Sequence, residues 1–509
     1  MMLAMKTVDN ETGTALPELL RNLATVTPGC NVRVTGLSMD SRTLRPGDAF
    51  LASPGQKDHG WNHVVAAVRA GARVVLADAA AVTPVPDLAG IPVIPIPRLG
   101  SVAGVIAARF FGEPSQQLQV VGVTGTNGKT STSHYIASAM QEFTGGHAGI
   151  IGTLGSGPVG RLGVTELTTP DPVSLQSQMA AQLAEGVQVI AMEVSSHALD
   201  LGRIAGVHFT TAVFTNLTRD HLDFHGDMAA YAAAKQRLFD LPELQHAVVN
   251  LDDEFGRDLM RACSARIPVV GYQLANTGLP KSAPDDVLLG VVRDSAPGQL
   301  HIDVLGPWGG GPLRCALTGS FNAANVLAAC ATLHTLSVPF ARALELLAHA
   351  RAVPGRMEAF RAPGRPTVIV DYAHTPDAVE KALQALRGQC RGRLICVFGC
   401  GGDRDPGKRP QMGAVAEACA DRTVITSDNP RSENPDAIIT AILAGMRDPD
   451  RAIVEPDRTA AITLAVRAAG PEDVVLVAGK GHETWQETAG RRLPFSDRQL
   501  VRTLLERDA

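Results

Sequence analysis

The sequence predicts an α/β fold, with parallel sheets covered by helices on both faces and spread over three domains. Length is one reason, because 509 residues exceed what a single hydrophobic core usually serves. Composition is another, since 45% of the residues are hydrophobic and only 4% are aromatic. The third is an alternation of short, nearly continuous apolar runs with Ala/Leu-rich helical stretches. Such runs are typical of strands buried on both faces of a parallel sheet.

Each apolar run stops at small, polar or charged residues. The runs are LQVVGVTG, VQVIAMEVSS, FTTAVFTN and HAVVNLDD in the middle of the chain, and PTVIVDYAH, RLICVFGCGGDRD, RTVITSDNPR and DVVLVAGKGHE near its end. Ligands of open parallel sheets bind at the carboxyl ends of the strands. We therefore expect the reactive groups at these polar ends.

Two polar stretches containing Pro and Gly, GEPSQQLQ and AVPGRME, predict the domain boundaries. They divide the chain into residues 1–116, 117–353 and 354–509. The segment Asn276–Pro312 is rich in Gly, Pro and Asp, which predicts loops and short strands.

Charge and targeting signals narrow the class of protein. A net charge of −5 and a pI near 6.3 argue against electrostatic binding of nucleic acid. The first residues, MMLAMKTVDNETGT, lack the apolar region of a signal peptide, and no stretch is apolar enough to insert in a membrane. Of the eight cysteines, only Cys396 and Cys400 are closely spaced, without a second pair to complete a zinc site. We expect reduced, mostly buried thiols in a cytoplasmic protein.

The stretch VVGVTGTNGKTSTSHYIASAM predicts a phosphate-binding loop between a strand and a helix. The strict pattern G-x-x-x-x-G-K-[ST] would need glycine where this chain has Val123. Gly125 and Gly128 still allow the backbone N–H groups of the turn to surround phosphate oxygens. Lys129 can reach the β- and γ-phosphates, and the Thr130 hydroxyl can bind Mg²⁺. The alternative is a structural glycine turn.

Two further strand ends carry groups that suit a metal–nucleotide site. Glu193 lies near the end of the run VIAMEV, and His221 lies in TNLTRDHLDFHG. The alternatives are a helix N-cap or solvated carboxylate for Glu193, and a structural histidine for His221.

Nine motifs in order resemble one family. The motifs TGTNGKT, EVSSHAL, TNLTRDHLDFHG, SFNAANVLAA, PGRME, DYAHTPD, GCGGDRDPGKRP, DNPR and GKGHE are similar to those of the Mur ligases of bacterial cell-wall synthesis, and most similar to the MurE-type branch. The likeness covers nearly the whole chain. The phosphate loop of that family is T-G-T-N-G-K-T, so Val123 is normal there.

The resemblance implies a fold and a reaction. It implies an N-terminal domain for the UDP end of the substrate, a central P-loop-type ATP domain and a Rossmann-like C-terminal domain for the incoming amino acid. The reaction implied is ATP-driven amide formation through an acyl phosphate. The ATP-binding residues implied are Gly125, Thr126, Asn127, Gly128, Lys129, Thr130, Asn322, Asn325, Arg356, Asp371 and His374. Helix N-capping is the alternative for Asn322 and Asn325.

The resemblance also implies two Mg²⁺ ions and a modified lysine. Thr130 and Glu193 would bind the first ion, and His221 the second. Lys235, in MAAYAAAKQRLF, matches a lysine that is carbamylated in the family and helps to hold the second ion. By sequence alone Lys235 is better explained as a solvated helix lysine. Lys129, His221 and Lys235 are the catalytic residues implied.

Two substrate sites complete the implied assignment. The resemblance implies that UDP-N-acetylmuramoyl-L-Ala-D-Glu is bound by Met39, Ser41, Thr168, Thr169, Ser195 and Arg203, with Asp40 and Arg42 nearby. Leu201 stands where some relatives carry a polar residue, which leaves one substrate hydrogen bond in doubt.

The motif DNPR resembles that of the family members that add meso-diaminopimelate rather than lysine, and the resemblance implies diaminopimelate as the amino acid. Diaminopimelate has a carboxylate and an ammonium at its distal end. Arginines can bind the distal carboxylate in a bidentate manner, and a glutamate can bind the distal ammonium. The residues implied are Arg404, Asp428, Asn429, Pro430, Arg431, Gly479 and Glu483. A surface salt bridge is the alternative for Arg431.

Two rival functions stay open at this point. One is a sister ligase, such as folylpolyglutamate synthetase or another Mur ligase, and the other is a non-catalytic nucleotide-binding scaffold or switch. The N-terminal DSR and the DNPR motif argue against the first, and the full set of metal and phosphate residues against the second. We expect a monomer.

Overall fold

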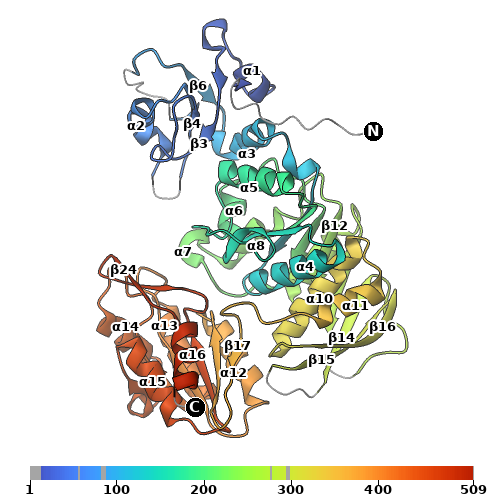
Figure 1. Cartoon of the computed structure of the whole chain (residues 1–509), viewed down its shortest axis with the longest axis vertical. Coiled ribbons are helices and arrows are strands. Elements are labelled where there is room, and N and C mark those ends of the chain that lie inside the picture. The colour runs from blue at the N-terminus through green and yellow to red at the C-terminus, as the bar shows by residue number, and fades with distance from the viewer. Residues whose placement is uncertain (1–12, 56–57, 82–87, 276–277, 294–297, 508–509) are drawn as a thin grey trace. The chain divides into compact units, whose positions relative to one another are not determined.

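The structure, a computed structural model, describes residues 13–55, 58–81, 88–275, 278–293 and 298–507. It confirms the predicted α/β class, because its main sheets have four, ten and six strands, and helices flank them (Figure 1). Contacts group the chain into two compact units, formed by residues 1–124, 140–213 and 234–247 and by residues 125–139, 214–233 and 248–509. The boundaries after residues 116 and 353 stay predictions.

The first sheet is parallel throughout. Its elements, with the small β1–β2 ribbon beside them, are β1 (Thr14–Ala15), α1 (Leu16–Leu19), β2 (Arg33–Val34), β3 (Leu37–Ser38), β4 (Ala49–Ala52), α2 (Val64–Arg69), β5 (Val74–Asp78), β6 (Val93–Ile96) and α3 (Leu99–Phe110). The strand order is β3-β4-β5-β6. Leu51 and Leu76 share a core with α1 and α3, whereas Phe50 and Val75 share another with α2. The nearly continuous apolar runs follow from this burial on both faces.

The second sheet has ten strands in the order β16-β15-β14-β13-β12-β11-β7-β10-β8-β9. The strands are β7 (Gln119–Thr124), β8 (Ala148–Gly152), β9 (Gly155–Pro158), β10 (Val189–Glu193), β11 (Thr211–Phe214), β12 (His246–Asn250), β13 (Val269–Leu274), β14 (Val287–Arg293), β15 (Leu300–Gly306) and β16 (Gly309–Cys315). The helices are α4 (Lys129–Phe143), α5 (Pro172–Ala184), α6 (Ser196–Asp200), α7 (Leu222–His225), α8 (Met228–Gln236), α9 (Glu254–Cys263), α10 (Ser320–Thr335) and α11 (Phe340–Ala348). Strand β10 pairs in parallel with β7 and with β8, and β7 and β10 are two of the runs predicted to lie in a parallel sheet.

The segment Asn276–Pro312 differs from its prediction, although residues 276–277 and 294–297 lie outside the described part. Instead of short strands, β14, β15 and β16 are each 7 residues long and pair antiparallel in succession. In β15 the buried side chains of Leu300, Ile302 and Val304 alternate with less buried ones. The last strand, β16, has the sequence GGGPLRC and could not be recognised from its sequence. It is an edge strand, and Gly and Pro are tolerated at the edge of a sheet.

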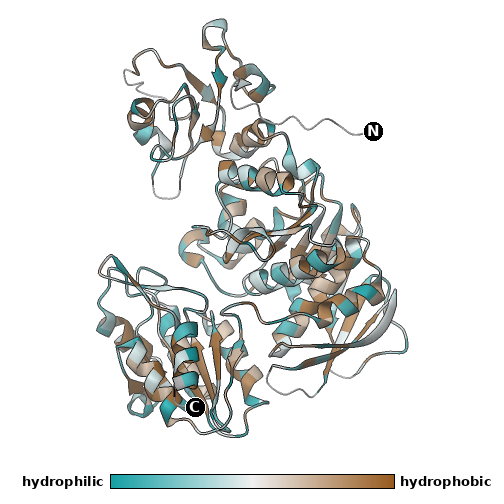
Figure 2. Ribbon diagram, in the orientation of Figure 1, coloured by the Kyte–Doolittle hydropathy of each residue, from teal (hydrophilic) through white to brown (hydrophobic). Residues whose placement is uncertain are grey.

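The third sheet carries the C-terminal motifs. Its elements are β17 (Glu358–Phe360), β18 (Thr367–Asp371), α12 (Pro376–Arg387), β19 (Leu394–Phe398), α13 (Lys408–Cys419), β20 (Arg422–Ile425), α14 (Pro435–Leu443), β21 (Ile453–Val454), α15 (Arg458–Ala468), β22 (Val474–Ala478) and α16 (Asp497–Arg507). The order is β17-β18-β22-β19-β20-β21, and only β17 is antiparallel to its neighbour. One face packs on α12, α13 and α14 and the other on α15 and α16, which explains the hydrophobic strands in Figure 2.

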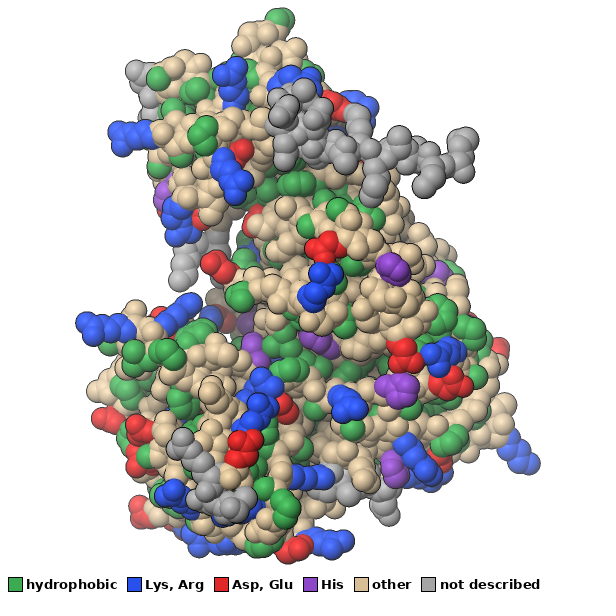
Figure 3. All heavy atoms as spheres, viewed as in Figure 1, with side chains coloured by type: hydrophobic (Ala, Val, Ile, Leu, Met, Phe, Trp, Pro, Cys, Tyr) green, Lys and Arg blue, Asp and Glu red, His purple; other side chains and the backbone are tan. Residues whose placement is uncertain are grey.

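Surface and thiols are unremarkable for an α/β protein. Acidic and basic side chains are interspersed over the face shown in Figure 3. No helix among the described residues is long and apolar enough to cross a membrane. All eight cysteines are free thiols and five of them are buried, as predicted for most of them.

Candidate active site

The phosphate loop joins the end of β7 to the start of α4. Gly125 and Gly128 have φ values of +148° and +86°, which favour glycine. A Cβ at Gly125 would collide with the Thr215 hydroxyl, and one at Gly128 would come within 2.5 Å of the Asn325 side-chain oxygen. Both glycines are therefore required by space as well as by conformation.

The chain that follows β11 holds this loop in place. The backbone N–H of Thr126 donates to Asn216 O at 2.8 Å, and that of Asn127 donates to Asn216 Oδ1 at 2.9 Å. Thr215 Oγ1 donates to Asn127 O at 2.6 Å. The Lys129 ammonium donates to Gly125 O and to Thr126 O, each at 2.8 Å. The loop thus carries a cation directly over its own turn, where a phosphate chain would lie.

Arg356, from the PGRME stretch, reaches the same loop. Its Nη2 donates to Thr130 Oγ1 at 3.1 Å, and its guanidinium lies 4.3 Å from the centre of the Tyr372 ring. Among the described residues its buried Nε has no hydrogen-bond acceptor. A buried donor without an acceptor is costly, so this atom fits an anionic ligand such as a phosphate oxygen.

Asp371 and His374 organise the segment around Arg356. The Asp371 carboxylate accepts from the N–H groups of Met357 and Ala373 at 2.7 and 2.8 Å, and burial raises its pKa. Burial, aided by Lys408, lowers the pKa of His374. Asp371 therefore fixes the chain beside Arg356, a role the sequence did not specify.

Asp220 is a candidate site residue that the sequence analysis missed. Burial alone would raise its pKa, but the nearby His221, His374 and Lys408 outweigh burial and hold that pKa below its ordinary value. His221 has a left-handed backbone, with φ of +56°, and its Nε2 lies 3.4 Å from the Asp220 carboxylate. A carboxylate oxygen suits Mg²⁺ better than an imidazole does, so Asp220 belongs beside His221 among the candidate ligands.

Asn322 and Asn325 do not cap a helix, because the N-cap of α10 is Gly319. Both residues lie within α10, and both are buried. Tyr135 OH donates to Asn322 Oδ1 at 3.1 Å, and Asn325 Nδ2 donates to the same atom at 3.2 Å. The N-capping alternative is therefore wrong, and the two amides link α10 to α4 behind the phosphate loop.

Glu193 is neither an N-cap nor a solvated carboxylate, since it is 1% exposed. Its Oε1 accepts from Thr153 N at 2.7 Å, while its backbone oxygen accepts from Thr169 Oγ1 at 2.8 Å. The N-cap of α6 is Ser195, whose side chain accepts from Ala198 N.

The residues of the middle segment that are predicted to bind the muramoyl peptide adjoin Glu193. Arg203 Nη1 donates to Thr169 O at 3.0 Å, and burial lowers the pKa of this guanidinium. Thr168 Oγ1 lies 3.0 Å from Thr153 Oγ1. The structure thus brings Thr168, Thr169, Glu193, Ser195 and Arg203 into one neighbourhood.

Lys235 is 1% exposed on α8, so the solvated-helix alternative is wrong. It belongs to the same compact unit as Glu193, whereas Thr130 and His221 belong to the other. Among the described residues no group of three or more His, Cys, Asp or Glu side chains is placed to hold a metal. The four proposed ligands include a threonine and a lysine and thus form no such group.

In the N-terminal segment, Met39 packs against the core of the first sheet and Ser41 is half-buried. Arg42 Nη2 lies 2.6 Å from Asp40, and this hydrogen bond lowers the pKa of the Asp40 carboxyl. The DSR motif therefore forms a short turn with an ion pair at the surface.

The DNPR and GKGHE motifs meet in the C-terminal unit. The hairpin of β23 (Trp485–Thr488) and β24 (Arg491–Pro494) holds Arg431 through a bond from Arg431 N to Glu487 O at 3.1 Å. Arg431 Nη1 donates to Gly402 O at 2.6 Å. A Cβ on Gly401 would lie 2.8 Å from Arg431 Nη1 and 3.8 Å from Arg404 Cγ. Two arginines of the predicted carboxylate site therefore flank one glycine.

Asn429 and Glu483 are joined directly, at 2.8 Å from Nδ2 to Oε2. Behind them lies Lys480, which the sequence analysis did not single out. A Cβ on Gly479 would collide with the Asp428 carboxylate, and Pro430 O lies against Gly402. All seven residues predicted for the amino-acid site thus come from strand ends of one sheet or from loops packed on them.

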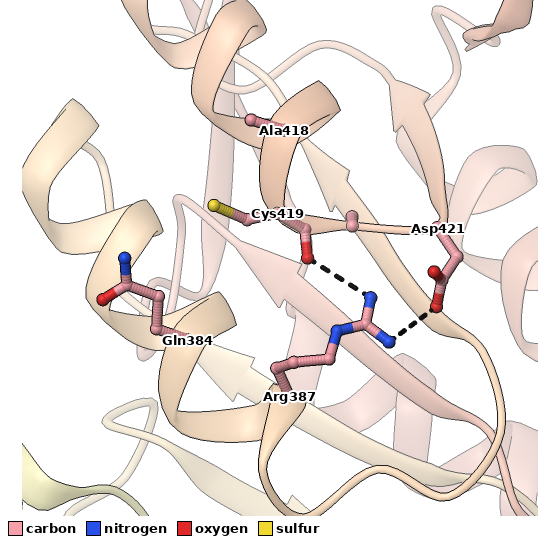
Figure 4. A pocket seen from close by; sticks show the side chains of 6 residues that line it. Gln384, Arg387, Ala418, Cys419 and Asp421 are labelled. Atoms are coloured by element: carbon pink, nitrogen blue, oxygen red, sulfur yellow. Dashed lines mark hydrogen bonds and ion pairs between the residues drawn. The ribbon is translucent and has the colours of Figure 1, made fainter.

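A surface cavity of about 480 Å³ lies elsewhere in this unit, lined by Gln384, Arg387, Ala418, Cys419, Ala420 and Asp421. Figure 4 shows Arg387 reaching the Cys419 carbonyl and the Asp421 carboxylate. None of the predicted site residues lines this cavity.

Comparison with known proteins places these features in one family. Family models match residues 33–111 (Mur ligase family, catalytic domain), 123–333 (Mur ligase middle domain) and 355–481 (Mur ligase, glutamate ligase domain). Similar relatives are UDP-N-acetylmuramoyl-L-alanyl-D-glutamate–2,6-diaminopimelate ligases. That of Alkalilimnicola ehrlichii is 50% identical over 92% of this chain and 94% of its own. The ligase of Coxiella burnetii is 47% identical over 92% of this chain and 94% of its own. The ligase of Pseudomonas aeruginosa is 45% identical over 91% of this chain and 93% of its own.

Solved structures agree. A UDP-N-acetylmuramoyl-L-alanyl-D-glutamate–2,6-diaminopimelate ligase superposes with a TM-score of 0.67 at 31% identity, over 97% of this chain and 99% of its own. MurF from Acinetobacter baumannii has a TM-score of 0.65 at 18% identity, over 97% of this chain and 99% of its own. Folylpolyglutamate synthase from Mycobacterium tuberculosis gives 0.60 at 21% identity, over 79% and 94%. The last two show the fold alone.

Proposed function

The chain belongs to the Mur ligase family, and from this premise we propose that it joins meso-diaminopimelate to UDP-N-acetylmuramoyl-L-Ala-D-Glu, forming ADP and phosphate, in peptidoglycan precursor synthesis. The observation that carries the proposal is the 50% identity, over 92% of the chain, to a ligase named for these substrates. The neighbouring DNPR and GKGHE motifs support it, since Asn429 and Glu483 share a hydrogen bond.

The chemistry proceeds in two steps. The D-glutamate carboxylate attacks the γ-phosphorus of ATP, an O–P bond forms, and ADP leaves. The diaminopimelate amine then attacks the acyl phosphate carbonyl, a C–N bond forms, the C–O bond to phosphate breaks, and the amine releases a proton. Two anions must meet in the first step, so the site needs fixed positive charge. Lys129 and Arg356 provide it beside the loop, where Arg356 Nε lies buried.

Mg²⁺ and a carbamylated lysine are the finer part of the proposal. When bound, Mg²⁺ would neutralise phosphate charge and orient the γ-phosphate. Thr130 and the buried Glu193 are proposed ligands of one ion. His221 and carbamylated Lys235 are the proposed ligands of a second ion. Burial disfavours an unpaired ammonium, and carbamylation of the buried Lys235 would replace that ammonium with an anion that the metal ion can neutralise.

For the amino acid, Arg404 and Arg431 are proposed to hold the distal carboxylate, and Glu483 the distal ammonium. Lysine lacks the distal carboxylate, so the two arginines would have no carboxylate to bind. The site should therefore bind lysine more weakly than diaminopimelate. A monomer in the cytoplasm is the proposed state.

The test is a ligation assay read by mass spectrometry. Reactions contain UDP-N-acetylmuramoyl-L-Ala-D-Glu, ATP and Mg²⁺, with meso-diaminopimelate or L-lysine in parallel, and the Lys129→Met variant as control. A tripeptide product with diaminopimelate alone is expected. A product with lysine alone would keep the ligase and refute the pocket assignment, and no product with either would refute the proposed function.

A further inference from the structure

Lys480 is a fully buried lysine in the middle of the GKGHE motif. Its side chain is 0% exposed, whereas that of Glu483 is 16% exposed. Lysine is rarely buried without a partner, because desolvating its charge is costly. Here its Nζ donates to Glu483 Oε2 at 2.7 Å and to Asn429 Oδ1 at 3.0 Å, and lies 5.4 Å from the centre of the Trp485 ring.

The glycines on either side of Lys480 make this burial possible. Gly479 and Gly481 have φ values of +115° and +51°. A Cβ on Gly481 would lie 2.6 Å from Gly355 O and 2.8 Å from Tyr372 Cβ. The backbone is thus pressed against its neighbours on both sides, and the lysine side chain is directed inward between them.

The contacts of Lys480 define the orientation of the Asn429 amide. Asn429 Oδ1 faces two donors, Lys480 Nζ and Glu487 N, at 3.0 and 2.9 Å. Its Nδ2 faces an acceptor, Glu483 Oε2, at 2.8 Å. Only one of the two amide orientations satisfies all three groups, so Lys480 fixes which end of the amide is a donor in the pocket.

The same lysine selects the ligand-facing part of the Glu483 carboxylate. Both donors, Lys480 Nζ and Asn429 Nδ2, bind Oε2. A carboxylate has acceptor sites on each oxygen, so Oε1 is the oxygen that these contacts leave for an ammonium ligand. Lys480 itself has no exposed atom with which to bind the substrate.

We propose that Lys480 is a positioning residue of the diaminopimelate site, which holds the Glu483 carboxylate and the Asn429 amide in the orientation that receives the distal amino-acid group of the substrate. This inference rests on the proposed function, because it takes Glu483 as the partner of the ligand ammonium. It adds a residue that acts through two others and does not touch the substrate.

The experiment compares steady-state KM values for meso-diaminopimelate, ATP and the UDP-linked dipeptide in Lys480→Met, Glu483→Gln and the double variant. The exposed Lys281→Met is the matched control. We expect Lys480→Met to raise the diaminopimelate KM at least about tenfold, the scale of lost supporting contacts at other sites. The other two KM values should stay within about twofold, and the double variant should match Glu483→Gln, because coupled residues are not additive.

Three outcomes overturn the proposal. An unchanged diaminopimelate KM in Lys480→Met, while Glu483→Gln raises it, refutes the role of Lys480 alone. An unchanged KM in Glu483→Gln refutes the pocket assignment and the role of Lys480 with it. A common rise of all three KM values in Lys480→Met indicates a merely structural role.

If Lys480→Met does not fold, the double variant decides, because it buries no unpaired charge. A diaminopimelate KM equal to that of Glu483→Gln supports the proposal. Without Lys480, Glu487 N still donates to Asn429 Oδ1, so a further rise of about tenfold means that Lys480 acts neither through Glu483 nor through Asn429, and overturns the proposal.

Discussion

Replacing Arg458 by methionine should destabilise the C-terminal sheet more than any exposed ion-pair change. Arg458 and Asp497 form an ion pair in which both side chains are 0% exposed. Arg458 Nε and Nη2 donate to the two Asp497 oxygens at 2.8 and 2.7 Å. Burial opposes the charged guanidinium, yet Asp497 raises the pKa of Arg458 above its ordinary value.

The magnitude follows from the charge left behind. In Arg458→Met the Asp497 carboxylate stays buried without its cation, which costs about 3–5 kcal/mol. Arg458 Nη2 also donates to Ala478 O at 2.9 Å and Nη1 to Ser427 O at 3.3 Å. These carbonyls precede Gly479 and Asp428, so we expect a weaker affinity for diaminopimelate as well.

Because multidomain proteins unfold in steps, the assay is hydrogen exchange of the amides of β18, β19 and β22. Their opening free energy should fall by about 3–5 kcal/mol. The control is Arg387→Met, which removes the Arg387–Asp421 ion pair drawn in Figure 4. Both side chains are 42% exposed, so this pair should contribute only about 0–1 kcal/mol. The variant Arg458→Met/Asp497→Leu removes both charges and should recover most of the loss. A loss in Arg458→Met no larger than that in Arg387→Met would refute the reasoning.

Three further predictions concern the reaction and its pH dependence. Lys129→Met should lower kcat by about 100- to 1,000-fold, because one fixed donor to the phosphates is lost. A stopped assay of ADP release measures kcat, and near-normal turnover would contradict the assignment of the phosphate loop. Arg431→Ala should raise the diaminopimelate KM by about 100-fold, as for a charged hydrogen bond of about 3 kcal/mol, with the ATP KM unchanged; equal rises in both would instead indicate a structural salt bridge. Burial, with Arg356, Arg498, Lys480 and His134, lowers the pKa of His482 to about 3. Between about pH 6.5 and pH 3, His482 therefore binds a proton in the unfolded chain but not in the folded chain. The free energy of unfolding should fall as the pH is lowered through this range, by up to about 1.4 kcal/mol per pH unit. In His482→Gln this part of the pH dependence should be absent, as chemical unfolding at several pH values would show; parallel profiles of the two proteins would contradict the shift.

Local sequence was enough to predict the fold class and the strand ends that carry the motifs. Apolar runs bounded by polar residues report burial on both faces of a sheet, and Gly125 and Gly128 mark a turn that other residues cannot adopt. Residues 287–315 were harder, because β16 consists largely of Gly and Pro and has no alternating pattern. The assignment of individual side chains to ATP, metal and substrates rests on resemblance and stays a prediction.

Tertiary structure decided the partners and the burial of the charged groups. Lys129, Lys235 and Lys480 look alike in the sequence, yet Lys235 and Lys480 are buried, and Lys480 meets Asn429 across 51 residues of chain. Arg458 meets Asp497 across 39 residues. Such pairs depend on the order of the strands, which places β22 between β18 and β19, and no local pattern encodes that order. The sequence by itself therefore determined which chemistry this protein carries, whereas the packing of the sheet decided which charges hold that chemistry in place.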